Sequence, residues 1–348
     1  MSGEGLSCNS DRADDMTLPD FLKSRRDAMQ HSLGFRNRRD DARFWRKQVQ
    51  YAYLAAIPPC SRAANSVDRS ALDPERQRLK LRFESGAESD ALFIFPTSDK
   101  PLPAVLMLHD HGGEFDIGWQ KMSADSAGRH WVDRYYGGVF AADRLAAQGF
   151  AVLVVDAFGW GSRYAGGFEA QQANAANAMQ LGWSLAGIVA SEDVQAARWL
   201  AQQDGVDPNR VASWGFSFGA FRAWQVAALC PDIKASVSIA WMARRHGLML
   251  EGNKLLLGQS YFYMLHPSLT GALDFPDMAG AGAGKPLFMR CGDADPLFPA
   301  QSVVGAYQDL SDIWADFDAK VDCTLFTGGH ECSPDVQDQA ARFLARCM

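Results

Sequence analysis

The segment from Val206 to Leu229 reads VDPNRVASWGFSFGAFRAWQVAAL, and it decides the fold. An apolar run at 211–214, typical of a strand, leads directly into GFSFG at 215–219, and helix-forming residues without proline follow. Small residues on both sides of Ser217 allow a tight, strained turn that presents its hydroxyl above the end of the strand. The N–H of Phe218 then points toward any oxyanion that forms there. The segment predicts a nucleophilic serine; a glycine-rich turn without chemistry is the simpler alternative.

The composition argues against several classes of protein. The 348 residues carry a formal net charge of −7, and phosphate binding requires clustered Lys and Arg, so a nucleic-acid partner is not expected. Seven cysteines without a C-x-x-C pair predict neither a disulfide framework nor a zinc site. The polar start of the chain lacks the apolar core of a secretion signal, and no later run is long enough to span a membrane. We therefore expect a cytoplasmic protein without membrane contact.

The first part of the chain has a different pattern from the rest. Residues 1–17 are polar and predicted to be disordered. Residues 18–75 form a predicted helical extension with apolar stripes up to Leu54. This N-terminal arm could cap the active site, cover a sheet edge or form a homodimer interface, and the sequence favours none of the three. Residues 76–348 form the predicted catalytic domain.

The catalytic domain reads as an α/β fold with a mostly parallel central sheet flanked by helices. Its first two predicted strands alternate apolar and polar residues, as in an antiparallel hairpin, and later strands are continuously apolar, as in a sheet covered on both faces. Strand, helix, strand order is the crossover unit of a parallel sheet. Strands are predicted at 79–83, 91–95, 104–108, 150–155, 211–214, 235–239, 287–290 and 323–326, and helices at 139–148, 184–203 and 335–346, besides the one that follows Ser217.

Ligands of such sheets bind beyond the carboxyl ends of the strands, so the residues after each apolar run are the candidates for the site. After the run ending at Leu108 comes HDHGG, residues 109–113, whose glycines allow a turn that presents backbone N–H groups. We assign the second oxyanion donor to the backbone of His111. A metal site at His109 and His111 is disfavoured because the sequence offers no obvious third ligand.

Two more strand ends supply an acid and a base. CGDADPLFP follows the run 287–290, and either Asp295, our first choice, or Asp293 can orient a histidine. TGGHE follows 323–326 and places His330 on a loop before the last helix. With Ser217, this gives the chain order Ser, Asp, His, which predicts a catalytic triad.

Substrate contacts are predicted at two further strand ends. Trp160 lies in DAFGWGSR and could line the pocket or only pack within the core. Trp241 and Arg244 follow the strand after the helix of the serine turn, and Arg244 could bind an anionic group or pair with acidic neighbours. Residues 244–283 form a long insertion that we interpret as a lid, although burial in the core or a dimer contact would also explain its apolar residues.

These motifs resemble the α/β-hydrolase superfamily and, within it, the branch of dienelactone hydrolases and acetyl xylan esterases. The resemblance covers the chain from about Leu79 to the C-terminus. It rests on GFSFG, on LHDHGGEFDIGWQKM at 108–122, on DAFGWGSR at 156–163, on LGWSLAGIVASEDVQAARWL at 181–200, and on CGDADPLFP and GGHE near the end. It implies an α/β-hydrolase fold and a triad of Ser217, Asp295 and His330 that acts on carboxylic esters without a cofactor.

The sequence departs from these relatives in two places. Asp110 stands where relatives often have glycine, and a carboxylate so close to the oxyanion hole would oppose the negative charge unless it points away. The nucleophile is serine, which disfavours a dienelactone hydrolase proper, since that enzyme uses cysteine. Without a secretion signal, extracellular deacetylation of plant polymers is not expected either.

Three functions follow from this pattern. The leading interpretation is a serine hydrolase that cleaves a small-molecule ester through an acyl-enzyme, with the N–H groups of Phe218 and His111 as oxyanion hole and no metal. A peptidase similar to prolyl oligopeptidase shares the triad order, but too few residues precede the sheet for that family's propeller. A non-catalytic binding protein is disfavoured because every member of the triad is present.

Overall fold

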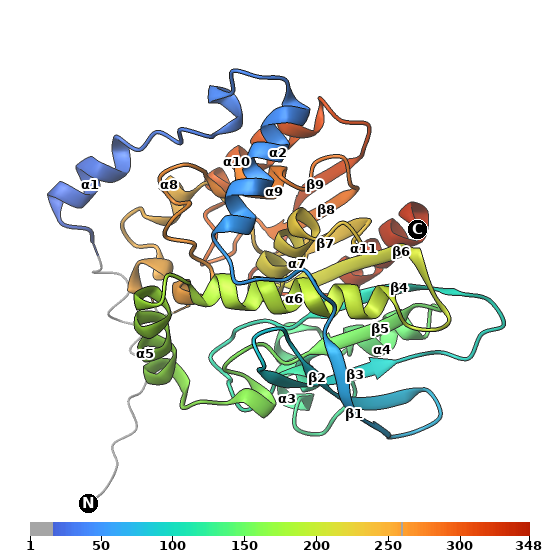
Figure 1. Ribbon diagram of the computed structural model, residues 1–348. Coiled ribbons are helices and arrows are strands. Elements are labelled where there is room, and N and C mark those ends of the chain that lie inside the picture. Colours follow the sequence, from blue (N-terminus) through green and yellow to red (C-terminus); the bar gives the residue numbers. More distant parts are fainter. Residues whose placement is uncertain (1–16, 259) are drawn as a thin grey trace, which may run out of the picture.

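The computed structural model describes residues 17–258 and 260–348, which form a sheet with helices on both faces (Figure 1). The predicted disordered N-terminus, residues 1–17, lies outside the described residues except for Thr17. The strands of the described chain are β1 (Asn65–Ala71), β2 (Arg76–Arg82), β3 (Glu88–Ile94), β4 (Leu102–Leu108), β5 (Ala151–Val155), β6 (Val206–Phe216), β7 (Ala235–Ile239), β8 (Leu287–Gly292) and β9 (Val321–Phe326). The α-helices are α1 (Asp20–Asp27), α2 (Ala42–Ala55), α3 (Arg129–Tyr135), α4 (Ala141–Ala146), α5 (Gly167–Gln180), α6 (Leu185–Ala201), α7 (Phe218–Leu229), α8 (Arg245–Leu248), α9 (Phe275–Gly280), α10 (Ala300–Trp314) and α11 (Pro334–Cys347).

The strands form one mixed sheet in the order β1-β2-β3-β5-β4-β6-β7-β8-β9. The first three strands pair antiparallel, and β3 is also antiparallel to β5. From β5 through β4 to β9 every pair of neighbours is parallel. The predicted fold, an opening hairpin and a mostly parallel sheet, is therefore confirmed.

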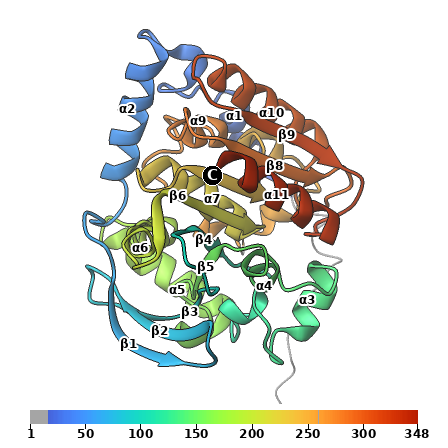
Figure 2. The same cartoon turned by 90° about the vertical axis from the view of Figure 1, so that its right-hand side faces the viewer.

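Helices cover both faces of the sheet (Figure 2). One face carries α6, α7 and α10, with α2 and α9 packed outside α7, and the other carries α4 and α11. Strand β4 is continuously apolar because both of its faces are buried. Leu106 and Leu108 belong to the core on the first face, and Val105 and Met107 belong to the core on the second. No helix of the described chain is long and apolar enough to cross a membrane.

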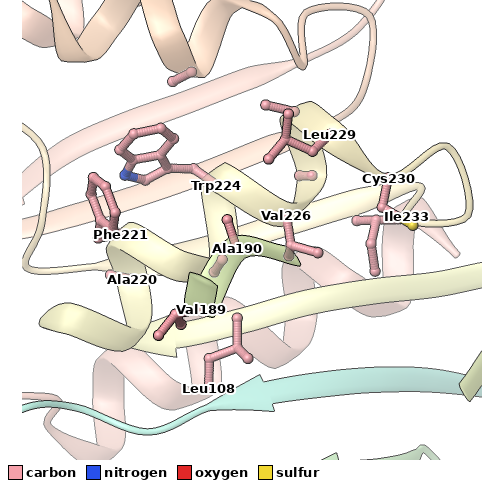
Figure 3. Packing of buried hydrophobic residues seen from close by; sticks show 14 of the residues in the cluster. Leu108, Val189, Ala190, Ala220, Phe221, Trp224, Val226, Leu229, Cys230 and Ile233 are labelled. Carbon is pink, nitrogen blue, oxygen red and sulfur yellow. The ribbon is translucent and has the colours of Figure 1, made fainter. Parts of the chain in front are cut away.

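Helix α7 begins at the serine turn, and its position fixes that turn against the sheet. Figure 3 shows Ala220 and Val226 of this helix beside Val189 and Ala190 of α6, with Leu108 of β4 close by. Alanines at this contact let the two helices approach closely. A buried ion pair joins the same helices: the guanidinium of Arg222 donates to both carboxylate oxygens of Asp193, over 2.7 and 2.9 Å.

We expect Arg222→Met to lower the free energy of unfolding by about 3–5 kcal/mol, because it leaves the buried carboxylate of Asp193 without its cation. Chemical denaturation at neutral pH measures the loss. The double variant Arg222→Met/Asp193→Leu removes both charges and is expected to recover much of the stability. A single variant as stable as the parent protein would contradict this account.

The predicted helical extension, residues 18–75, is only partly helical. It contains α1 and α2, but its last part is strand β1, which extends the sheet beyond the predicted hairpin. The sequence hides this strand because all seven of its residues are exposed, and an edge strand without a buried face needs no apolar alternation. Helix α2 buries Trp45 and Val49 against α7 and α9 rather than covering a sheet edge. A homodimer through the N-terminal helices stays a prediction.

Two long helices were not predicted from the sequence. Helix α5, GFEAQQANAANAMQ, is rich in Ala, Asn and Gln and buries only Gln171, Ala175 and Ala178, so it has no apolar stripe to detect. Helix α10 does bury residues at helical spacing, including Val303, Tyr307 and Leu310, and this signal was readable.

His266 makes stability depend on pH. Its ring is buried, Nε2 donates to Gln225 Oε1 over 2.7 Å, and burial lowers its pKa to about 3. An unfolded chain protonates histidine near pH 6.5, so between about pH 6.5 and 3 the unfolded state binds a proton that the folded state does not. Stability is therefore lost as the pH falls through this range.

We expect His266→Gln, which can keep the bond to Gln225, to reduce the loss of unfolding free energy between pH 7.5 and 5 by about 2 kcal/mol. Denaturation at both pH values measures it. His130→Gln is the control, because it removes a histidine at an exposed site, where Nε2 lies 3.0 Å from Glu114 Oε1, and it should change the slope less than His266→Gln does. An identical slope in parent and His266→Gln would contradict the assignment.

Candidate active site

Ser217 lies at a strained turn between β6 and α7. Its backbone has φ 55° and ψ −126°, a region that costs a non-glycine residue about 1–3 kcal/mol, and its N–H donates to the carbonyl of Ile239 over 2.8 Å. The flanking glycines are required by close backbone contacts. A Cβ on Gly215 would lie 2.0 Å from the carbonyl oxygen of Gly219, and one on Gly219 would lie 1.8 Å from that of Leu108. The GFSFG spacing is thus explained by sterics, independently of any chemistry.

The structure brings the three predicted triad residues together. His330, on the loop after β9, has Nε2 at 2.8 Å from Ser217 Oγ and Nδ1 at 2.7 Å from Asp295 Oδ2. Asp295 follows β8 and is buried, and its Oδ1 accepts the N–H groups of Leu297 and Phe298 over 2.8 and 3.3 Å. These contacts hold one carboxylate oxygen, while the other binds the histidine and also accepts from Cys291 Sγ over 3.7 Å.

The reserve acid has another place. Asp293 is exposed, and its Oδ1 accepts the N–H of Gly328 over 3.1 Å, in the loop that carries His330. Asp293 therefore supports the loop. Among the described residues, the carboxylate that binds His330 is that of Asp295.

Two aromatic rings flank the imidazole of His330. The Phe216 ring lies 5.0 Å from it between centroids, and the Phe298 ring is stacked on it at 6.0 Å with an interplanar angle of 17°. The faces of aromatic rings attract a cation at such distances. A positive charge on His330 would therefore be stabilised by both rings.

His111 and Phe218 line the same cavity as Ser217. Among the hydrogen bonds of the described chain, neither residue's N–H has an acceptor. The His111 ring is anchored elsewhere: Gly113 N–H donates to Nδ1 over 3.1 Å, and Nε2 donates to Gln171 Oε1 over 2.7 Å. Burial lowers its pKa to about 3, so the ring stays neutral. The N–H groups of His111 and Phe218 are therefore available to an oxyanion.

Asp110 also lines this cavity, and its carboxylate is bound by other side chains. Its Oδ2 accepts from Trp131 Nε1 over 3.1 Å and from the Tyr136 hydroxyl over 2.7 Å, while Oδ1 lies 3.7 Å from Lys121 Nζ. The negative charge that the sequence placed beside the oxyanion hole is thus balanced by a buried ammonium.

The cavity over Ser217 has a volume of about 290 Å³ and is mainly aromatic. The insertion 244–283 supplies Leu255 and Met264 to its wall, together with Ser260 and the exposed Lys254. Trp241, a predicted substrate contact, also lines the cavity. The aromatic lining residues are Trp131, Tyr135, Phe168, Phe216, Phe218, Trp241 and Phe298.

Two residues predicted as substrate contacts, Trp160 and Arg244, lie outside the lining of this cavity, and each takes the alternative role that the sequence allowed. Trp160 is fully buried and lies outside the cavity lining, and its Nε1 donates to the carbonyl of His111 over 3.1 Å. The loop that carries Trp160 packs against the loop at 109–113 and does not line the cavity over Ser217. Arg244 makes a bidentate ion pair with Asp309, over 2.6 and 2.8 Å, and lines a different cavity beside the N-terminal arm. Its charge is therefore committed to an acidic neighbour.

Sequence reasoning missed Lys121, Gln171 and Phe168. Gln171 and Phe168 come from α5, where Phe168 stacks on the His111 ring at 5.8 Å. The only sequence signal for Lys121 was its place in the motif at 108–122, because a lysine in a loop is usually exposed. Within residues 17–258 and 260–348, no three His, Cys, Asp or Glu side chains are grouped to hold a metal ion.

The chain resembles known proteins in both sequence and fold. Residues 138–328, more than half of the chain, match the dienelactone hydrolase family. A protein of Bacillus subtilis (strain 168) named as a hydrolase, YtaP, is 26% identical over 276 residues, which cover 78% of this chain and 88% of that protein.

Solved structures give the same fold at low sequence identity. A protein of Bacteroides fragilis NCTC 9343 assigned as an acetyl xylan esterase is 18% identical, with a TM-score of 0.67 over 89% of this chain and 83% of that one. The glucuronoyl esterase of Solibacter usitatus is 15% identical, with a TM-score of 0.61 over 88% and 94%. These similarities establish the fold.

Proposed function

The chain belongs to the dienelactone hydrolase family, a family of ester hydrolases, and we propose that it cleaves carboxylic esters with Ser217 as nucleophile, His330 as base and acid, and Asp295 as the group that orients the histidine. The observation that carries this proposal is the continuous chain of hydrogen bonds through His330, 2.8 Å to Ser217 and 2.7 Å to Asp295. These are the distances at which a proton passes from a hydroxyl to an imidazole.

The proposed reaction has two halves. His330 Nε2 takes the Ser217 proton while Oγ attacks the ester carbonyl, and the resulting oxyanion accepts the N–H groups of Phe218 and His111. The bond to the alcohol oxygen breaks, the imidazolium gives that oxygen its proton, and the acyl group remains on Oγ. Water then attacks the acyl group and gives its proton to His330, and Oγ leaves with that proton as the acid is released. Every proton passes through the same nitrogen.

The cavity supports a small or aromatic substrate. At about 290 Å³ it lies at the lower end of ligand pockets, and aromatic side chains form the largest share of its wall. We therefore propose esters of short acyl chains or of aromatic acids or alcohols. A cytoplasmic location remains part of the proposal and is supported by the described cysteines, Cys60, Cys230, Cys291, Cys323, Cys332 and Cys347, which are all free thiols.

Initial rates on p-nitrophenyl acetate, butyrate, octanoate and benzoate test this proposal, with fluorophosphonate labelling mapped by mass spectrometry. We expect label on Ser217 and faster hydrolysis of acetate, butyrate or benzoate than of octanoate. A fast p-nitroanilide substrate beside slow esters would indicate a peptidase. Neither labelling nor hydrolysis would indicate a binding protein on a hydrolase scaffold.

A further inference from the structure

The peptide bond between Asp110 and His111 is anchored from its carbonyl side. The Asp110 carbonyl oxygen accepts from His109 Nδ1 over 2.9 Å and from Lys121 Nζ over 3.2 Å. His109 can donate there because its Nε2 accepts the N–H of Ala157 over 3.0 Å, which leaves the proton on Nδ1. In a trans peptide the C=O and N–H point in opposite directions. Anchoring this oxygen therefore fixes the direction of the His111 N–H, the proposed oxyanion donor.

Lys121 also anchors the next peptide. Its Nζ donates to the carbonyl of His111 over 2.9 Å, and Trp160 Nε1 donates to the same oxygen over 3.1 Å. A single ammonium thus joins two consecutive carbonyls of the oxyanion loop. A loop with two glycines, Gly112 and Gly113, would otherwise have wide backbone freedom.

The ammonium is fully buried beneath the loop. Its side chain has no exposed surface, and Nζ lies 4.9 Å from the centre of the Trp131 ring and 5.9 Å from that of Trp160. Burial lowers the pKa of Lys121, while the carboxylates of Asp110, Glu114 and Asp116 act in the opposite direction. The neighbouring His109 is kept neutral, because burial holds its pKa well below the usual range. Of the two basic groups that bind the Asp110 carbonyl, Lys121 and His109, Lys121 is therefore the cation.

We propose that Lys121, together with His109, is a positioning residue for ester hydrolysis: it holds the His111 N–H toward the oxyanion, and its charge polarises the same peptide. The inference rests on the proposed function. Lys121 does not touch the substrate. Its effect reaches the transition state only through the Asp110 carbonyl and the peptide that this carbonyl shares with the donor N–H.

A simpler role for Lys121 would be to neutralise the buried carboxylate of Asp110. The two roles differ in one double variant. If Lys121 only balances charge, Lys121→Met/Asp110→Asn regains the activity lost in Lys121→Met, because no charge is left unpaired. If Lys121 acts through the carbonyls, the double variant regains stability but stays slow.

We expect Lys121→Met and the double variant to lower kcat for p-nitrophenyl acetate by about 10- to 100-fold, with KM changed less than about 3-fold, since losing an oxyanion donor outright costs about 100- to 1000-fold. Lys285→Met is the matched control. Lys285 is a partly buried lysine that also donates to two carbonyls, those of Ala227 and Cys230, at 2.6 and 2.7 Å, but lies outside the cavity lining. The substitution Lys285→Met is expected to lower the melting temperature and leave kcat unchanged.

A transition-state analogue separates positioning from general structural damage. Benzyl trifluoromethyl ketone accepts Ser217 Oγ at its carbonyl carbon and becomes an oxyanion as His330 takes the serine proton, whereas benzyl methyl ketone stays mostly unreacted. In both Lys121 variants we expect the inhibition constant of the fluorinated ketone to rise by the same factor as kcat falls, and that of the methyl ketone to stay constant. Thermal unfolding confirms that each variant is folded.

Wild-type kcat in the double variant, or an unchanged inhibition constant for the fluorinated ketone, would overturn the inference. Neither result would affect the proposed function, because the parent enzyme would still hydrolyse the ester and take the fluorophosphonate label. A parent protein that neither hydrolyses esters nor is labelled at Ser217 would overturn both.

Discussion

Ser217→Ala is expected to lower kcat for p-nitrophenyl esters by about four to six orders of magnitude, as loss of a triad serine does elsewhere. The substitution removes the only atom that can form the acyl-enzyme and leaves His330 Nε2 without its 2.8 Å partner. KM should change little, because the aromatic cavity wall and both oxyanion N–H groups remain. Alanine can keep the strained backbone at φ 55°, so the melting temperature is expected to stay close to that of the parent. Initial rates on highly purified protein measure the loss.

Ser213→Ala provides the matched control for Ser217→Ala. Ser213 lies on the same strand, β6, and its buried hydroxyl donates to the carbonyl of Ala223 over 2.8 Å. The hydroxyl also bonds to Ser236 Oγ over 3.0 Å, so its loss should cost stability, by about 1–3 kcal/mol for two hydrogen bonds, and leave kcat unchanged. If Ser217→Ala retained the hydrolysis rate of the parent, the nucleophile would lie elsewhere.

The meeting of Ser217, Asp295 and His330 at one site could be predicted from the sequence because each of them lies just beyond the end of a strand. Ser217 comes directly after β6, Asp295 and His330 lie three and four residues beyond the ends of β8 and β9, and the carboxyl ends of parallel strands meet at one edge of the sheet. The apolar runs that mark those strands are local signals. A sequence with such signals therefore specifies both the sheet and the place of its chemistry.

The same reasoning could not identify what each loop side chain contacts. Arg244 does follow a strand, but its partner Asp309 lies on α10, and nothing near Arg244 in the sequence announces that pair. Trp160 also follows a strand, yet its loop turns under His111 because its indole N–H finds the carbonyl there. Position along the chain places a residue at the edge of the sheet, whereas its partners are tertiary contacts.

Elements without a buried apolar face were equally beyond the sequence. Strand β1 pairs on one side only and exposes all its residues, so no alternation marks it. Helix α5 brings Phe168 and Gln171 to the oxyanion loop while most of its other residues face solvent. The two residues that contact this loop thus lie on a helix with little apolar pattern in its sequence. A pattern of apolar residues in the sequence reflects burial, and a residue can contribute to the site without belonging to such a pattern.

Asp295→Asn is expected to lower kcat by about 10⁴-fold without unfolding the protein, because it reverses the tautomer of His330. The N–H groups of Leu297 and Phe298 bind Oδ1 of the carboxylate and will select the amide oxygen for that position. The amide NH₂ then faces His330 Nδ1, 2.7 Å from the present Oδ2, and can only donate to it. A neutral histidine must then carry its proton on Nε2, where it faces Ser217 Oγ and cannot accept the serine proton.

The pH dependence of Asp295→Asn distinguishes a tautomer effect from misfolding. Hydroxide can remove the serine proton directly, so we expect the residual kcat to rise at alkaline pH where the parent has reached a plateau. Asp293→Asn is the control, since an amide oxygen at Asp293 can still accept the Gly328 N–H and hold the loop, and its kcat should stay within about 3-fold of the parent. If instead Asp293→Asn were the inactive variant and Asp295→Asn active, the acid of the triad would be Asp293. The hydrogen bond at 2.7 Å would then be only a structural contact.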